Sequence, residues 1–248
     1  MKWRFLPFEM HAAAMNMAID ESILEHISEG KAKPTVRLYG WNPAAITIGN
    51  FQCREDEVDM NACKEAGVPV VRRITGGGAV FHEHEITYSI LAPETFFPKH
   101  IQQSYQIICG VVIEALDKLG IAAQYRPIND IVVGSRKISG SAQTRRKGVL
   151  LQHGTILLDV NIAKMFSLLT ISKEKISDKY VQSVKKLVTS LLEQNEKLKE
   201  EQVIDALMEA FSEGKQVEIG RLSKEEFTRA HYIMKSKYET EEWNNCRK

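Results

Sequence analysis

The stretch Arg72-Arg73-Ile74-Thr75-Gly76-Gly77-Gly78-Ala79-Val80-Phe81-His82 places two adjacent arginines and three consecutive glycines between two strand-like runs. The run before it, 68–71, is short and apolar, and the run after it extends over 79–91. Three glycines let the backbone adopt positive φ angles and approach a ligand closely. Backbone N–H groups in such a turn form a concave anion site, and arginines beside it suit carboxylate or phosphate. The stretch predicts either a site for an acidic or phosphorylated small molecule or a tight strand connection with two solvated arginines.

The composition around this stretch is that of an ordinary globular protein. The chain has 248 residues, of which 44% are hydrophobic and 26% charged, enough for one large domain or two small ones. The net charge is +1, from 33 basic and 32 acidic residues, so no broad field attracts nucleic acid or a membrane. No apolar run approaches membrane-spanning length, and the first residues do not form a signal peptide. We therefore expect a cytoplasmic protein that binds neither nucleic acid nor membranes.

The four cysteines are scattered through the chain, and no two have the spacing of a metal knuckle or a redox pair. Reduced thiols in a cytoplasmic protein are the simplest explanation. The positions are Cys53, Cys63, Cys109 and Cys246.

Hydrophobic periodicity indicates the order of the helices and strands. We expect helices over 12–29, 56–66, 102–119, 181–192, 202–211 and 223–238. Strands are expected over 36–39, 45–48, 68–71, 79–91, 131–133, 137–142 and 149–160. A strand-rich body over 34–160 with helices around it predicts an α+β fold, with a mixed or antiparallel sheet flanked by helices.

A second informative segment follows the hairpin signal Gly134-Ser135. Strand alternation predicts that Lys137, Ser139 and Ser141 share one face. A lysine followed by small residues has open space around its ammonium, which fits a contact with a carboxyl or phosphate group. A lysine that protects an edge strand is the alternative. Asp130, before the hairpin, is expected either to bind a metal such as Mg²⁺ or to cap the strand.

The histidines and the first helix give weaker signals. His153 shares a strand face with apolar neighbours, and such a histidine is more often a satisfied core residue than a catalyst. His82 and His84 share a face without a third ligand at a recognisable spacing, so we do not expect zinc. Asn16 and Asp20, four apart on the first helix, indicate a solvated face or a local cap. The chain lacks the phosphate loop, the dinucleotide fingerprint and the nucleophile elbow of other enzyme classes.

Taken in order, several blocks resemble the lipoate–protein ligase and octanoyltransferase family. They are R-R-x-[ST]-G-G-G-A-V-F-H at 72–82, N-D-x-V-V at 129–133, R-K-I-S-G-S-A at 136–142 and H-G-T-x-L-L at 153–158. The resemblance runs from about residue 12 to about residue 243. It implies a catalytic domain like those of biotin ligases and class II aminoacyl-tRNA synthetases. It also implies chemistry on a medium-chain acyl group destined for a lysine.

Two reactions are known in this family, and they need different groups. Ligases join lipoate to ATP to give lipoyl-AMP and then acylate the lysine, which requires cations and backbone donors. Octanoyltransferases take the acyl chain from acyl carrier protein onto an activated cysteine. Neither segment that carries the family's cysteine, here 125–130 and 150–158, contains one. We therefore predict an ATP-dependent lipoate–protein ligase, with a cysteine-dependent octanoyl or lipoyl transferase as the alternative. The segments 141–148 and 39–43 are closer to the transferases.

The resemblance also implies roles for individual residues. The three glycines would pass under the acyl chain and the phosphate, and Arg72 would meet the phosphate. Lys137, the catalytic residue, would contact the acyl carbonyl and the α-phosphate. Asp130 would hold Mg²⁺ and, with Asn129, the nucleotide. The other predicted binding residues are Gly76, Gly77, Gly78, Val80, His82, Ser139, Gly140, His153 and Thr155.

The implied partners are acceptor proteins with a lipoyl domain, either the E2 subunit of a 2-oxoacid dehydrogenase or the H protein of glycine cleavage. Many ligases of this family carry a C-terminal accessory domain. We expect residues 1–248 to form a single catalytic domain without it. Either a separate small protein supplies the accessory domain, which we predict, or the enzyme does without it. The expected cofactors are ATP and Mg²⁺, with lipoate as the substrate.

Overall fold

The computed structural model describes residues 2–170 and 186–245. Within these residues the larger sheet has eight strands, in the spatial order β11-β1-β2-β6-β10-β9-β8-β7. Strands β11, β1 and β2 run parallel, and every other neighbouring pair is antiparallel. The bounds are β1 Trp3–His11, β2 Thr35–Trp41, β6 Glu85–Pro93, β7 Ala123–Arg126, β8 Asp130–Val133, β9 Arg136–Arg146, β10 Val149–Leu157 and β11 Val217–Ile219.

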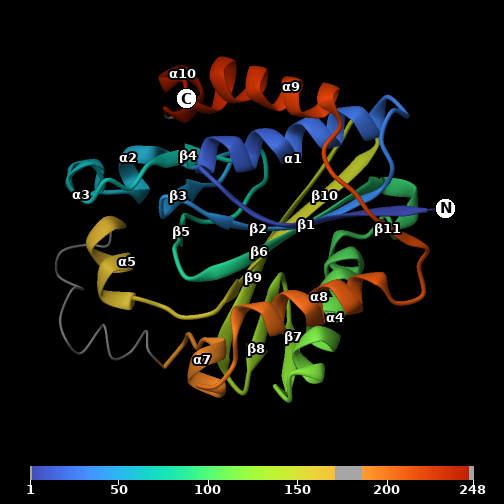
Figure 1. Cartoon of the computed structure of the whole chain (residues 1–248). Coiled ribbons are helices and arrows are strands. Elements are labelled where there is room, and N and C mark those ends of the chain that lie inside the picture. The colour runs from blue at the N-terminus through green and yellow to red at the C-terminus, as the bar shows by residue number, and fades with distance from the viewer. Residues whose placement is uncertain (1, 171–185, 246–248) are drawn as a thin grey trace.

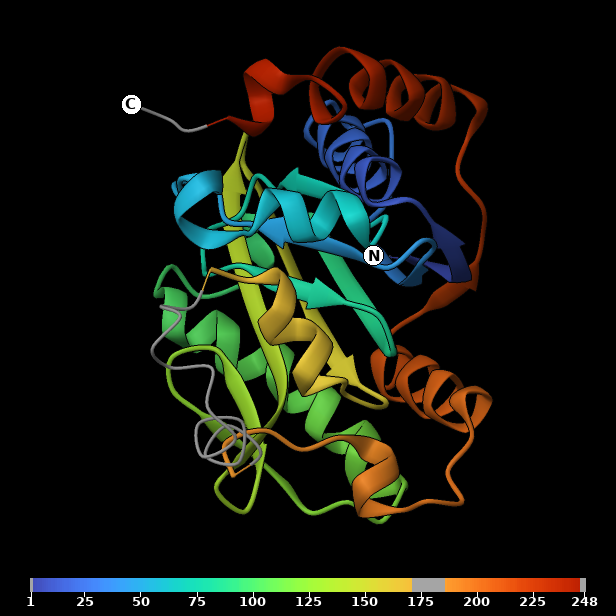
Figure 2. The ribbon, with the colours of Figure 1, turned by 90° about the vertical axis from the view of Figure 1, so that its left-hand side faces the viewer.

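A smaller sheet lies beside the larger one, in the order β4-β3-β5 (Figure 1). Its strands are β3 Ala45–Ile48, β4 Val70–Arg72 and β5 Val80–His82. The glycine stretch connects β4 to β5, and these two strands pair with opposite edges of β3. Three short helices lie next to the smaller sheet (Figure 2). They are α2 Arg54–Glu57, α3 Met60–Glu65 and α5 Ile162–Leu168. Apolar side chains from β3, α3 and α5 form a common core there.

Helices cover both faces of the larger sheet (Figure 1). Helices α1 Ala13–Ser28 and α9 Lys224–Ile233 lie on one face, and α4 Ile101–Lys118 and α8 Glu200–Ser212 lie on the other. The remaining short elements are a 3₁₀ turn at Glu94–Phe96, α7 Leu191–Gln194, a π-helical turn at Met234–Tyr238 and α10 Glu241–Asn244. None of the helices in 2–170 and 186–245 is long and apolar enough to cross a membrane.

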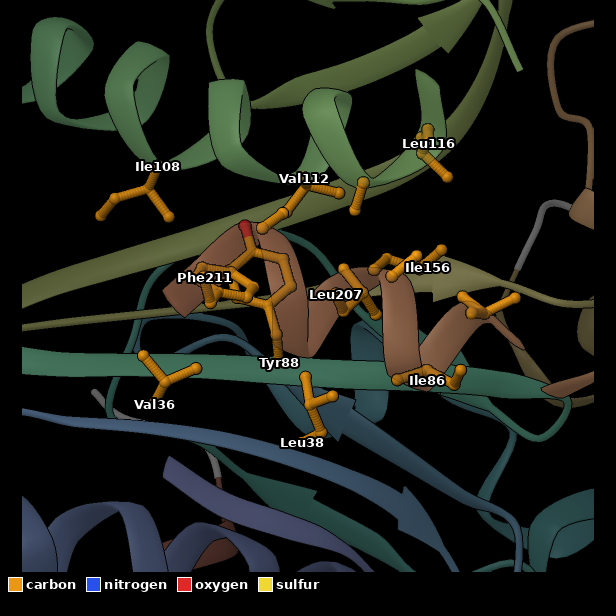
Figure 3. Close-up of a cluster of buried hydrophobic side chains, with 14 of the residues drawn as sticks. Val36, Leu38, Ile86, Tyr88, Ile108, Val112, Leu116, Ile156, Leu207 and Phe211 are labelled. Carbon is orange, nitrogen blue, oxygen red and sulfur yellow. The ribbon is translucent and has the colours of Figure 1, made fainter. Parts of the chain in front are cut away.

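The core under α4 and α8 shows why these segments are helical (Figure 3). Ile108, Val112 and Leu116 recur every four residues, so they form one stripe on α4. This stripe and Phe211 of α8 pack against Tyr88 in the sheet. Each fully buried side chain of this size contributes roughly 1.5–3 kcal/mol. Burial of this stripe therefore fixes α4 on the sheet.

Helix α1 differs from the prediction of a solvated polar face. Asn16 and Asp20 are fully buried, because α1 lies between the sheet and α9. Arg37 of β2 donates to Asp20 Oδ1 at 3.1 Å and also to the side chain of Asn16. Ser89 Oγ donates to the same Asp20 oxygen at 2.9 Å. A buried charge of this kind needs such partners, and only the neighbouring strands provide them.

The α+β class with a mixed sheet and flanking helices is confirmed, and the helices predicted over 12–29 and 102–119 match α1 and α4. The strand predicted over 79–91 is two strands in different sheets, β5 and β6. The helix predicted over 56–66 is divided between the end of α2 Arg54–Glu57 and α3 Met60–Glu65. Strands β1, β7 and β11 were not predicted. Of the helix predicted over 181–192, residues 181–185 lie outside the described residues. In 186–192 only the last two residues are helical, at the start of α7.

Candidate active site

A cavity of about 310 Å³ lies between the two sheets, at the lower end of the range for small-molecule sites. Strands β2, β6, β9 and β10 form one wall, and β3, β5 and the glycine loop form the other. Buried residues such as Met17 and Tyr39 line one part, whereas the half-exposed Lys137 lines another. The cavity therefore has an apolar interior and a charged residue at its rim.

The two arginines of the decisive stretch have opposite surroundings. Adjacent residues in extended chain point to opposite sides, so only one of them faces the cavity. Arg73 lines it, whereas Arg72 is fully buried outside it. The guanidinium of Arg72 donates to six main-chain carbonyls, those of Gly49, Asn50, Gln52, Trp243, Asn244 and Asn245. The prediction that Arg72 meets a phosphate is therefore not supported, because its donors join the turn after β3 to the end of α10.

The glycine loop packs closely against the main chain at Gly49, which explains why this position and Gly77 are glycines. Gly77 has φ of +92°, a left-handed conformation that favours glycine. Its carbonyl oxygen lies against Gly49, where a Cβ would be only 2.0 Å away. Gly77 and Gly78 line the cavity, but Gly76 does not. The loop therefore brings bare main chain to the cavity wall, as the sequence predicts for two of the three glycines.

His82 occupies the wall between two polar partners. Its Nδ1 lies 2.7 Å from Glu85 Oε1, and its Nε2 lies 2.8 Å from Thr47 Oγ1. Trp41 stacks on the ring at 3.9 Å between centroids. Trp41 Nε1 and Thr87 Oγ1 also donate to Glu85 Oε1, at 3.0 and 2.7 Å. These contacts fix the orientation of the ring.

His153 has a matching arrangement on β10. Its Nε2 lies 2.8 Å from Thr75 Oγ1, and its Nδ1 lies 3.5 Å from Asp20 Oδ2. Burial, opposed by Asp20 and reinforced by Arg73, holds the pKa of His153 below its ordinary value. Burial raises the pKa of Asp20, but His153, Arg37 and Ser89 together bring it below the usual range. The pair is therefore a neutral imidazole beside a carboxylate.

Lys137 reaches the cavity because of a β-bulge. Ile131 pairs with Ser139 while the next residue, Val132, pairs with Lys137, so Ile138 is an extra residue in β9. One extra residue reverses the alternation of side chains. The prediction that Lys137 and Ser139 share a face is therefore wrong: Lys137 lines the cavity, whereas Ser139 is fully buried outside it.

The backbone and the side chain of Lys137 are both held in place. Its N–H donates to Leu187 O at 2.8 Å, and its carbonyl accepts from Thr189 N at 2.9 Å. Its Nζ lies 2.7 Å from Asp130 Oδ1. The other oxygen of Asp130 pairs with Arg126 at 2.8 Å. Both oxygens of Asp130 are therefore bound to cations, which removes the basis for the predicted magnesium ligand.

The structure brings most of the predicted site residues to one cavity. The predicted residues that line it are Gly77, Gly78, Val80, His82, Asn129, Lys137, Gly140, His153 and Thr155. Arg72, Gly76, Asp130 and Ser139 do not line it. Prediction from sequence missed Arg73, Thr47 and Trp41, although Arg73 stands in the quoted stretch. The described residues contain no group of three His, Cys, Asp or Glu that could hold a metal ion.

The cysteines of the described segments lie outside the cavity lining. Cys63 and Cys109 are buried free thiols, whereas Cys53 is disulfide-bonded, which corrects the expectation of reduced thiols throughout. Burial raises the pKa of Cys63 to about 11, with a smaller contribution from Asp59. Burial also raises the pKa of Cys109, against hydrogen bonds from Ser141, Tyr88 and Gln152. Neither environment favours a reactive thiolate.

The fold and the cavity agree with a family of acyl-handling enzymes. The family model named lipoyl protein ligase A/B catalytic domain matches residues 12–212, and the chain belongs to this family. Among its relatives, octanoyltransferase LipM of Geobacillus kaustophilus is 36% identical over 98% of this chain and 97% of its own length. Octanoyltransferase LipM of Brevibacillus brevis is 34% identical over 98% of each chain, and that of Bacillus subtilis 33% identical over 98% of this chain and 97% of its own.

Solved structures of similar proteins share the fold over the whole chain. A bipartite lipoate protein ligase from Thermoplasma acidophilum, described together with its E2 lipoyl domain as an archaeal lipoylation system, is 29% identical with a TM-score of 0.89. It covers 100% of this chain and 98% of its own. A lipoate-protein ligase A bound with ATP is 27% identical with a TM-score of 0.82, over 98% of each chain.

The relatives correct the predicted activity. Octanoyltransferases match nearly the full chain at 33–36% identity, so the prediction of an ATP-dependent lipoate–protein ligase is contradicted. The alternative prediction, a cysteine-dependent octanoyl or lipoyl transferase, agrees better with these relatives, although no cysteine of the described segments lines the cavity. ATP and Mg²⁺ were expected only for the ligase reaction, so these relatives do not support that expectation either. The cysteine-free segments 125–130 and 150–158 favour a ligase, whereas the transferase-like segments 141–148 and 39–43 indicate the activity of these relatives.

Proposed function

We propose that this chain is an octanoyltransferase, which moves an octanoyl group from a thioester donor to the amine of an acceptor lysine. The observation that carries the proposal is the full-length match to octanoyltransferases. The cavity supports it, because an apolar interior suits a hydrocarbon chain and Lys137 at the rim suits its carbonyl. The donor that we propose is an acylated carrier protein.

The transfer exchanges one bond for another. The C–S bond of the thioester breaks, an amide C–N bond forms to the acceptor lysine, and the proton lost by the amine ends on the released thiol. Negative charge develops on the acyl oxygen during this exchange. Fixed cations and main-chain N–H groups stabilise such charge without reorganising. Lys137 is positioned for this role, because its backbone and its Nζ are both held.

We propose a lysine of a lipoyl domain as the acceptor. The Thermoplasma acidophilum ligase, which shares the fold and 29% identity, belongs to a lipoylation system that includes an E2 lipoyl domain. In this chain the half-exposed Lys137 marks the rim where a protein-borne lysine would enter. The 2-oxoacid dehydrogenase E2 subunit and the glycine cleavage H protein are the two acceptor classes to compare.

Nucleotide-free transfer tests the proposal. The purified chain is incubated with octanoyl acyl carrier protein and a lipoyl domain, and the mass of the domain is followed. The expected result is the addition of one octanoyl group per domain, which Lys137→Ala abolishes. A lipoyl domain in which the acceptor lysine is replaced is the matched control. A domain that stays unmodified under these conditions, with a folded enzyme, would refute the proposed function.

A further inference from the structure

All five N–H groups of the Arg73 guanidinium are occupied within the protein. Nε donates to Thr75 Oγ1 at 3.1 Å, and Nη1 donates to both the carbonyl and the Oγ1 of Thr47, each at 3.1 Å. Nη2 donates to Gly76 O at 2.7 Å and to Gly78 O at 2.8 Å. A guanidinium carries five donors. Arg73 therefore lines the cavity with no donor left for a substrate.

The charge of Arg73 is buried without a carboxylate partner. The residue is 5% exposed, and no Asp or Glu of the described segments lies within ion-pair distance of it. Burial lowers its pKa to about 10. A buried charge that only neutral oxygens compensate is costly. A protein that keeps such a charge beside its cavity gains a fixed positive potential there.

The hydroxyl oxygens of Thr47 and Thr75 accept hydrogen bonds from Arg73, and each hydroxyl also contacts a histidine. The carboxylate of Glu85 only accepts hydrogen bonds, so His82 carries its proton on Nδ1. The His82 Nε2 lone pair then accepts from the hydroxyl of Thr47, which leaves the Thr47 oxygen for Arg73. His153 repeats this arrangement with Thr75, although its Nδ1 lies farther from its carboxylate, at 3.5 Å.

In the glycine loop the main-chain carbonyls have contacts within the protein, whereas two main-chain N–H groups have none among the residues that the structure describes. Arg73 binds the carbonyls of Gly76 and Gly78, and the carbonyl of Gly77 packs on Gly49. The N–H groups of Gly77 and Gly78 have no hydrogen-bond partner in the described part of the chain. Both glycines line the cavity. The arrangement therefore leaves main-chain donors next to the place where the acyl group would lie.

On the basis of the proposed transfer, we propose that Arg73 is a positioning residue that builds the oxyanion site. It draws the carbonyls of the glycine loop away from the cavity, so that the amides of Gly77 and Gly78 meet the acyl oxygen. Its unpaired charge adds to the field that stabilises negative charge on that oxygen, opposite Lys137. The two threonine–histidine pairs hold the guanidinium in this position.

The test replaces Arg73 by lysine, which keeps the charge but offers three donors instead of five. Loss of one oxyanion donor costs roughly 10²–10³ in kcat. We expect a fall of this order in kcat for Arg73→Lys, with KM for the octanoyl donor changed less than about threefold. We expect added guanidinium to restore part of the rate of Arg73→Ala. An Arg73→Lys variant with kcat near wild type, or one whose loss is confined to KM, would overturn the proposal.

A second measurement separates this inference from the proposed function. Hydrogen exchange of the loop amides at Gly76–Gly78 reports loop order without any substrate. We expect faster exchange in Arg73→Lys than in wild type, with exchange in α4 unchanged. If the wild-type enzyme transfers no octanoyl group, the proposed function is refuted. The hydrogen-exchange comparison then still tests whether Arg73 orders the glycine loop. Equal loop exchange in the two proteins would refute the positioning role even if the enzyme transfers octanoyl.

Discussion

The ammonium of Lys137 occupies the space that a side chain at Gly140 would need. A Cβ at position 140 would lie 2.6 Å from Lys137 Nζ and 2.7 Å from its Cε. The bulge in β9 brings these two residues to the same face of the strand. A glycine three residues after the lysine is therefore what allows the ammonium to lie flat over the strand and reach Asp130.

Gly140→Ala is expected to displace Lys137 without unfolding the protein. The atoms it meets are the far end of a flexible side chain, so the lysine moves and the backbone stays. We expect kcat for octanoyl transfer to fall at least about tenfold, because a misplacement near 1 Å costs on the order of 10²-fold. The melting temperature should change by only a few degrees.

Gly154→Ala is the matched control for this prediction. A Cβ there would meet the buried ring of Tyr88 at 2.6 Å and Ser141 Oγ at 2.7 Å. Overpacking a core in this way costs about 1–3 kcal/mol. Urea unfolding should therefore show a clear loss of stability for Gly154→Ala and little loss for Gly140→Ala. The reverse order would contradict the contact between Lys137 and Gly140.

Gly49→Ala is expected to displace the glycine loop, because Gly49 packs against the carbonyl of Gly77. The new Cβ would lie 2.0 Å from the carbonyl oxygen of Gly77, and a main-chain atom cannot move without shifting the loop. We expect kcat to fall on the order of 10²-fold. Gly110→Ala on α4, where nothing lies within 4 Å, is the control and should leave the rate unchanged. A fully active Gly49→Ala enzyme would show that the loop position is unimportant.

Neither buried thiol is expected to carry the octanoyl group. Cys63 and Cys109 lie outside the cavity lining, and burial raises the pKa of each. Cys63→Ser and Cys109→Ser should both keep kcat within about threefold of wild type, while the folded enzyme reacts slowly with an alkylating reagent. Peptide mapping after incubation with the octanoyl donor provides the check. An octanoyl thioester found on either residue would contradict this assignment.

His153 is expected to make stability depend on pH in the mildly acidic range. Burial lowers the pKa of His153 in the folded protein, whereas the unfolded chain titrates near 6.5. The unfolded state therefore binds more protons below pH 6.5, and the free energy of unfolding decreases as the pH falls from there. Urea unfolding at pH 8, 6.5 and 5.5 measures the slope. His153→Gln should have a shallower slope, with the remainder coming partly from His11, whose pKa burial also lowers.

Several features of the site were predictable because they depend on local sequence. The glycines between two strand-like runs, the hairpin at Gly134-Ser135 and the lysine before small residues each define a short-range geometry. The apolar stripe of α4 predicts its helix and the face that it buries. Strand β11 gave no such signal because three residues are too few for periodicity to show, and β1 and β7 were missed as well.

By itself, the sequence determined the α+β class, the family blocks and the place of Lys137 and the glycine loop along the chain. Only the tertiary structure decided that Arg73 rather than Arg72 reaches the cavity, that Asp20 is buried, and that a bulge places Lys137 over Gly140. The physical reason is that a strand pattern shows alternation but neither which side the cavity lies on nor where an extra residue enters. Burial and hydrogen-bond partners come from segments far apart in the chain, such as Thr75 and His153, and these meet only after the two sheets have packed together.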